Sequence, residues 1–91
     1  AEQGAAWGLV NHVSAPGRVL DEALEAARSI AANGPLAVRQ AKKSIHFGLQ
    51  GDLRTGCRFE IEAYNRLVSS ADRHEGVRAF NEKRQPQFKG E

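Results

Sequence analysis

The sequence is short of the residues that build self-contained metal or disulfide sites. Its 91 residues include one cysteine, three histidines and no methionine. A lone cysteine, Cys57, cannot form a disulfide framework inside the chain, and this favours a reducing, cytoplasmic location. Together with the widely spaced His12, His46 and His74, it does not supply the ligand set of an ordinary zinc site. We therefore expect no metal site, and we also expect no bound cofactor.

Long apolar runs are also missing. No window approaches the roughly eighteen consecutive apolar residues that a membrane-spanning helix needs. The first residues have neither the basic head nor the apolar stretch of a signal peptide. Apolar residues make up 41% of the chain and charged residues 26%, which is ordinary for a globular protein. The composition predicts one small domain, or part of a larger one, with no membrane partner.

Charge is nearly balanced overall but uneven along the chain. Thirteen basic and eleven acidic residues give a net charge of +2, which is too even to argue strongly for nucleic acid. However, no acidic residue occurs from position 26 to position 51. Two basic clusters result: Arg28, Arg39, Lys42 and Lys43, and then Lys83, Arg84 and Lys89. They are either a solvated surface or a site for the phosphates of a ligand or of RNA.

Apolar spacing predicts helices along most of the chain. A helical stub over 1–7 ends at Gly8, and residues 9–13 form a short strand or an extended link. Apolar residues at helical spacing predict a helix over 20–32. Gly34 and Pro35 then resemble the N-cap and first residue of a second helix, reaching about Phe47 and burying one apolar side.

The second half predicts two more helices and a polar tail. Asp52 is a good N-cap for a helix over 53–68, and that helix carries the apolar stripe Leu53, Cys57, Ile61, Tyr64 and Val68. Asp72 and Glu75 have the spacing of a capping box, which predicts a last helix ending near Arg84. Beyond Pro86 the tail is expected to be extended or frayed. The predicted fold is all-α.

No group of side chains in these patterns forms a catalytic site. Cys57 lies on the apolar stripe and is interpreted as a small buried hydrophobic residue. Glu60 and Glu62 are two apart on a helix and so point in different directions. We expect Glu62 to pair with Arg58 or Arg66 instead. The sequence therefore predicts no catalytic residue within this chain.

Three stretches carry a resemblance to a known family. Residues 70–90, SADRHEGVRAFNEKRQPQFKG, strongly resemble the closing motif of the crotonase (enoyl-CoA hydratase/isomerase) superfamily. Residues 6–13, AWGLVNHV, and residues 30–37, IAANGPLA, resemble two passages that precede it, in the same order and at similar spacing. Asp52-Leu53 and the Lys-Gly-Glu ending lean toward the branch similar to methylglutaconyl-CoA hydratase.

The resemblance implies that residues 1–91 are the helical C-terminal region of a larger α/β enzyme. Family members have an N-terminal ββα-superhelix core that carries the oxyanion hole and the acid–base glutamates. That core is absent from this chain, so the segment alone is expected to be inactive. Glu60, Glu62 and Glu75 are not assigned the role of those glutamates.

The resemblance also assigns two binding residues and a mode of assembly. Lys83 matches a lysine that approaches the phosphate or adenine of coenzyme A, and Tyr64 matches an aromatic residue beside the adenine. In the family, the C-terminal helices pack on the core and across the interface of a trimer, often within a hexamer. The apolar stripes are then expected to face a partner surface, which leaves them exposed in the chain alone.

The function implied by the resemblance is hydration of a 2-enoyl-CoA to a 3-hydroxyacyl-CoA, with the acyl-CoA as substrate. An isomerase, hydrolase or dehydratase of the same superfamily stays open, because the glutamates that separate these reactions lie upstream. A binding module of another class also stays open, holding RNA through basic residues. Those residues are Arg39, Lys42, Lys43, Lys83 and Arg84. A purely structural helical bundle is the third alternative.

Overall fold

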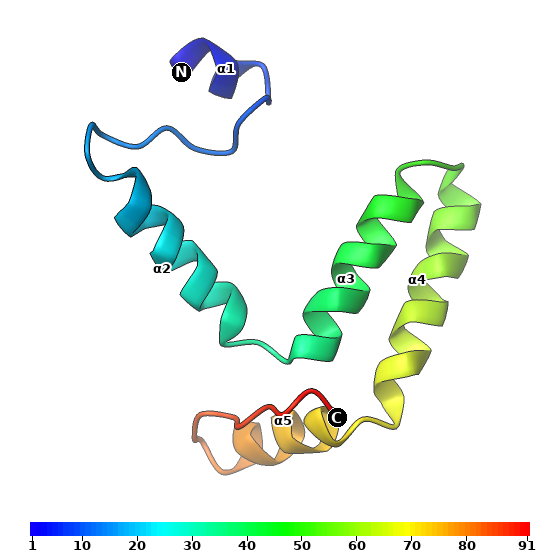
Figure 1. Ribbon diagram of the computed structural model, residues 1–91. Coiled ribbons are helices and arrows are strands. Elements are labelled where there is room, and N and C mark those ends of the chain that lie inside the picture. Colours follow the sequence, from blue (N-terminus) through cyan, green and yellow to red (C-terminus); the bar gives the residue numbers. More distant parts are fainter. The chain divides into compact units, whose positions relative to one another are not determined.

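The computed structural model describes all 91 residues and contains five helices and no strand. Along the chain these are α1 (Glu2–Ala6), α2 (Val19–Ala31), α3 (Pro35–Gly48), α4 (Leu53–Val68) and α5 (Ala71–Asn81) (Figure 1). Two compact units divide the chain, residues 1–30 and residues 31–91. The predicted all-α class is confirmed.

The first unit holds α1 and nearly all of α2. Gly8 follows α1 with a φ of 75°, the left-handed conformation expected of a glycine after a helix. Residues 9–13 form no strand; the first of them bend away from α1, and the Leu9 N–H donates to the Gly4 carbonyl at 2.8 Å. Glu22 of α2 ties this link down, because its carboxylate accepts a 2.6 Å hydrogen bond from the Ser14 hydroxyl and lies 3.1 Å from the His12 ring.

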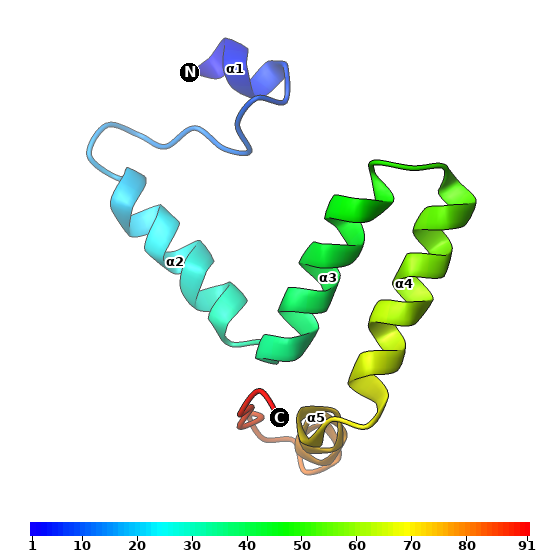
Figure 2. The same cartoon turned by 45° about the vertical axis from the view of Figure 1, so that its right-hand side comes forward.

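In the second unit, α3 and α4 form an antiparallel hairpin (Figures 1 and 2). Pro35 is the first residue of α3 with Gly34 as its N-cap, as predicted. Asp52 caps α4, and its carboxylate accepts from the Thr55 backbone N–H at 2.8 Å. Near the connecting loop the helices approach through two glycines. A Cβ added to Gly56 would lie 3.4 Å from the Cα and carbonyl oxygen of Gly48.

Helix α5 is capped two residues earlier than the sequence predicts. The N-cap is Ser70, whose hydroxyl accepts from the Arg73 backbone N–H at 3.2 Å. The predicted capping box of Asp72 and Glu75 is therefore wrong, because the serine two residues earlier takes the cap position. The helix also ends at Asn81 rather than near Arg84.

The C-terminal tail is extended but it is not frayed. Its backbone folds back on α5, where the Asp72 carboxylate accepts from the N–H groups of Lys89 at 2.7 Å and Gly90 at 2.8 Å. The ring of Phe88 covers two glycines, and a Cβ at Gly34 or at Gly76 would lie 3.7 or 3.6 Å from it. The tail thus joins the start of α3 to α5.

Few side chains are buried. Ala63, Ala79 and Asp72 retain 4%, 1% and 6% of their exposure. Cys57 is exposed, so its interpretation as a buried residue is wrong for this chain. On α3, Leu36 and Val38 are half-buried, but Ala41 and Ile45 are exposed, against the prediction that this side is buried. The exposure predicted for the large apolar residues is confirmed. It holds for Leu53, Ile61, Tyr64, Val68, Val77 and Phe80.

Candidate functional site

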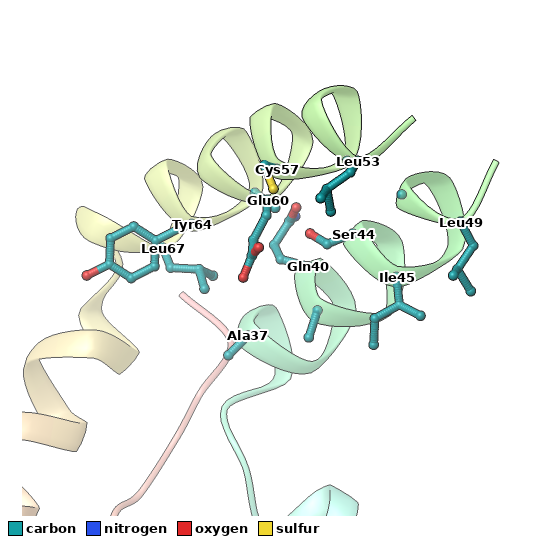
Figure 3. Close-up of a pocket in the computed structure, with 14 residues that line it drawn as sticks. Ala37, Gln40, Ser44, Ile45, Leu49, Leu53, Cys57, Glu60, Tyr64 and Leu67 are labelled. Atoms are coloured by element: carbon teal, nitrogen blue, oxygen red, sulfur yellow. The ribbon is translucent and has the colours of Figure 1, made fainter. Parts of the chain in front are cut away.

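An apolar groove of about 650 Å³ lies between α3 and α4 in the second unit (Figure 3). Its walls are mostly aliphatic, and Tyr64 and Leu67 lie toward one end. Three polar side chains stand among them, Gln40 and Ser44 from α3 and Glu60 from α4 (Figure 3). The other lining residues are Ala37, Ala41, Ile45, Gly48, Leu49, Leu53, Gly56, Cys57 and Ala63.

This groove lacks the groups of a nucleophilic or metal site. Cys57 lines it, but no histidine does. His12 pairs with Glu22 in the first unit, and His46 bonds to Gln50 at 3.0 Å. No group of three or more metal-ligating side chains occurs in the chain. The expected ion pair of Glu62 with Arg58 or Arg66 does not form.

Lys83 lies in an unusual turn at the end of α5. Its φ of 53° is left-handed, and it is the only residue other than glycine with a positive φ. The Lys83 N–H donates to the Phe80 carbonyl at 3.2 Å, and the Arg84 N–H donates to the Ala79 carbonyl at 3.0 Å. This pair of bonds defines a Schellman motif, whose left-handed position is usually occupied by glycine. A lysine there carries conformational strain that a glycine would not.

Arg84 is clamped by two carboxylates beside this turn. Its guanidinium donates to both oxygens of Glu75, at 2.6 and 3.0 Å, and its Nε donates to Glu82 at 2.6 Å. The Gln87 backbone N–H donates to Glu75 at 2.9 Å. The hydrogen bonds from Arg84 and from Gln87 together lower the pKa of Glu75 to about 2, and the two carboxylates raise the pKa of Arg84. Sequence reasoning missed this clamp, because its partners lie nine and twelve residues from Glu75.

The structure does not place the two predicted binding residues in one pocket. Tyr64, 57% exposed, lines the groove, whereas Lys83 does not. The backbone N–H of Lys83 donates to the carbonyl of an aromatic residue, Phe80, whose side chain is 83% exposed. In the C-terminal basic cluster, Arg84 is ion-paired with Glu75 and Glu82. On α3, Arg39, Lys42 and Lys43 are exposed, and the Lys43 ammonium lies 6.0 Å from the centre of the Phe59 ring.

Known proteins match the chain along its whole length. The sequence profile of the enoyl-CoA hydratase/isomerase family matches residues 1–91. The chain belongs to this family. YngF of Bacillus subtilis, whose name places it among the enoyl-CoA hydratases/isomerases, is 48% identical over 90 residues. That alignment covers 99% of this chain and 35% of YngF. The resemblance drawn from the three motifs is confirmed.

Two further relatives define the family setting. Mouse mitochondrial methylglutaconyl-CoA hydratase is 40% identical over 94 residues, covering 99% of this chain and 30% of its own. The crystal structure of an enoyl-CoA hydratase from Bacillus anthracis superposes with a TM-score of 0.97 at 45% identity. The superposition covers 35% of that enzyme's chain and 100% of this chain. The chain therefore spans about a third of the length of these family members.

No helix among the five has the length and hydropathy needed to cross a bilayer. The features that this chain does contribute are an unpartnered apolar groove, an exposed aromatic residue and an exposed lysine in a fixed turn.

Proposed function

We propose that this chain is the C-terminal helical region of an enoyl-CoA hydratase, which adds water across the double bond of a 2-enoyl-CoA to give the 3-hydroxyacyl-CoA. The observation that carries the proposal is the match of all 91 residues to the family, together with relatives that are named hydratases. In such an enzyme, backbone donors polarise the thioester carbonyl and glutamates move protons. Those groups belong to the region outside this chain, so the segment alone is inactive.

Within that enzyme, the chain contributes assembly and one wall of the coenzyme site. The apolar groove and the exposed stripe of α4 supply the surfaces for packing on the catalytic core and on other subunits of a trimer or hexamer. Lys83 supplies a cation for a coenzyme phosphate, and Tyr64 an aromatic face for the adenine. Both side chains are exposed and thus accessible.

The reaction is tested with the complete reading frame and a short-chain 2-enoyl-CoA, by following the conjugated enoyl-thioester absorbance. Rapid loss that requires glutamates outside this chain supports a hydratase. Coenzyme binding without loss of absorbance rejects hydration and moves the chemistry to an isomerase or another branch of the family. Failure to bind acyl-CoA at all rejects the coenzyme wall as well.

The role of Lys83 is tested with the Lys83→Gln variant, which removes the charge but keeps a non-glycine residue in the turn. We expect weaker coenzyme binding by about five- to tenfold, the loss typical of one charged contact. Lys89→Gln is the matched control, because it removes an exposed lysine charge from the tail that follows the Lys83 turn. Equal weakening in both variants would indicate a general charge effect and not a contact at Lys83.

For location, we propose the cytoplasm on the strength of the single cysteine, which forms no disulfide. A mitochondrial location is the alternative suggested by the names of the mammalian relatives. The RNA-binding alternative is less favoured, because Arg84, one of its five basic residues, is held by Glu75 and Glu82.

A further inference from the structure

Lys83 has a left-handed backbone conformation at the end of α5. A helix that ends in a Schellman motif gains most when the left-handed residue is glycine. This helix uses lysine there instead, although glycine residues occur elsewhere in left-handed turns of the same chain, at Gly8, Gly17 and Gly90. Strain at a single non-glycine position is a reason to look for a function of its side chain.

The charges around Lys83 are arranged so that its ammonium has no partner. Two carboxylates lie beside the turn, Glu82 next to Lys83 in the chain and Glu75 on α5, and both contact the neighbouring Arg84. Arg84 takes both, with three hydrogen bonds of 2.6, 3.0 and 2.6 Å. Lys83 itself takes part in no ion pair. One guanidinium thus neutralises the carboxylates that would otherwise attract the lysine.

The same contacts fix the backbone on both sides of Lys83. The Glu75 carboxylate joins the Arg84 side chain to the Gln87 backbone N–H, so α5 and the tail are held together by one group. The Glu75 side chain retains 16% of its exposure and that of Arg84 retains 36%, so the pair is partly shielded from water. A bidentate, charge-assisted pair of this kind sets geometry as well as energy.

We infer that Glu75 and Arg84 are positioning residues for Lys83, holding it in the left-handed turn with its ammonium unpaired and directed to the nucleotide phosphates of an acyl-CoA. The inference rests on the proposed function, since it requires Lys83 to contact the coenzyme. It goes further by assigning a role to an ion pair that touches no substrate. It also explains why a strained lysine occupies a glycine position.

The test uses the intact enzyme with two thioesters of the same 2-enoyl acid, one of coenzyme A and one of pantetheine. Pantetheine lacks the nucleotide and its phosphates, so a positioning defect at Lys83 should affect only the coenzyme A thioester. We expect Glu75→Gln and Arg84→Gln each to raise KM for the coenzyme A thioester about fivefold, with kcat unchanged. The pantetheine thioester should show no change in either constant.

A second-site variant separates positioning from a general loss of structure. In Arg84→Gln, the released Glu82 carboxylate can pair with Lys83, so adding Glu82→Gln should recover a large part of the lost affinity. The Lys83→Gly variant should raise the midpoint of thermal unfolding and at the same time raise KM for the coenzyme A thioester. A purely structural role would predict lower stability for Arg84→Gln. It would not predict that Lys83→Gly raises stability while weakening coenzyme binding.

The outcomes are distinguishable. If Lys83→Gln leaves KM for the coenzyme A thioester unchanged, the coenzyme contact of the proposed function is wrong and the inference falls with it. If Lys83→Gln raises KM but Glu75→Gln and Arg84→Gln do not, only the positioning role is overturned. Equal effects on both thioesters, or no recovery on adding Glu82→Gln, would also overturn it. Should Arg84→Gln fail to fold, the Glu75→Gln and Lys83→Gln measurements still decide.

Discussion

The hairpin of α3 and α4 and the last helix with its tail differ in what holds them together. The hairpin depends on close approach at Gly48 and Gly56 and leaves an open apolar groove on its surface. Helix α5 is joined to its tail by carboxylates, with Asp72 and Glu75 accepting five hydrogen bonds from groups of residues 84–90. The polar part completes its own contacts, whereas the hairpin leaves large apolar side chains exposed.

A short chain is held together here mainly by polar contacts, while many of its apolar side chains stay exposed. A 91-residue chain buries a limited part of its surface, and here only a few small or polar residues are fully covered. Polar contacts of fixed geometry keep the tail and the Lys83 turn in place without a large core. Apolar side chains such as Leu53, 84% exposed, are then free to form an interface.

The largest effect on stability is expected from Asp72→Ala. Asp72 is 94% buried by its neighbours and accepts from two backbone N–H groups, which the variant would leave without a partner. We expect a loss of about 3 kcal/mol in the free energy of unfolding, measured by chemical denaturation of the intact protein. Amide hydrogen exchange at Lys89 and Gly90 should quicken in the same variant. Unchanged exchange there would contradict the tail contact.

The next largest effect is expected from Gly56→Leu in the hairpin. The new side chain would start from a Cβ already 3.4 Å from the Gly48 backbone, so the helices must separate. Overpacking of this kind costs about 2 kcal/mol of unfolding free energy. Gly4→Leu in α1 is the matched control, because a Cβ there meets no atom within 4 Å. A similar loss in both variants would show that the glycine contact does not set the hairpin.

A smaller effect is expected from acid, through Glu75. Its pKa is about 2 in the folded chain and 4.5 as its ordinary value, so folding favours the ionised form. The stability it contributes is present above pH 4.5 and is lost as the pH falls through 2. Unfolding midpoints of the wild type should fall over this interval more steeply than those of Glu75→Gln. Parallel curves would mean that the Glu75 ion pair adds no measurable stability.

The smallest effect on folding, and the largest on association, is expected from Ile61→Gln on α4. Ile61 is 61% exposed, so the substitution should change the unfolding free energy of the 91-residue chain by less than about 0.5 kcal/mol. The unchanged chain is expected to self-associate or to be marginally stable, and the variant to associate less. Sedimentation velocity measures the association of the unchanged chain and of the variant. A cooperative unfolding transition from a clean monomer of the unchanged chain would contradict this prediction.

Local signals in the sequence predicted the helices well. Pro35 and Asp52 mark the starts of α3 and α4, because a proline at the first position and an N-cap aspartate act within one turn. The apolar stripe of α4 was also predicted correctly, but Cys57 was assigned to a core that the chain does not form. Periodicity shows which face is apolar and cannot show what covers it.

The candidate site was harder to predict, because its contacts are not local. Asp72 and Glu75 have the spacing of a capping box, yet both bond to residues of the tail, and Ser70 provides the cap. Nothing in the pattern signals the left-handed φ of Lys83, since glycine is the residue that predicts such a turn. Lys83 and Tyr64 came from the family resemblance alone, and their contact with coenzyme A stays a prediction.

The contact between Phe88 and Gly34 can form only after the hairpin of α3 and α4 has been synthesised. Gly48 and Gly56 are eight positions apart, so the hairpin closes a short loop and can form early. Phe88 meets Gly34 across more than fifty positions, and during synthesis it leaves the ribosome after every helix described here. We therefore expect the contact between the tail and the start of α3 to form after the hairpin.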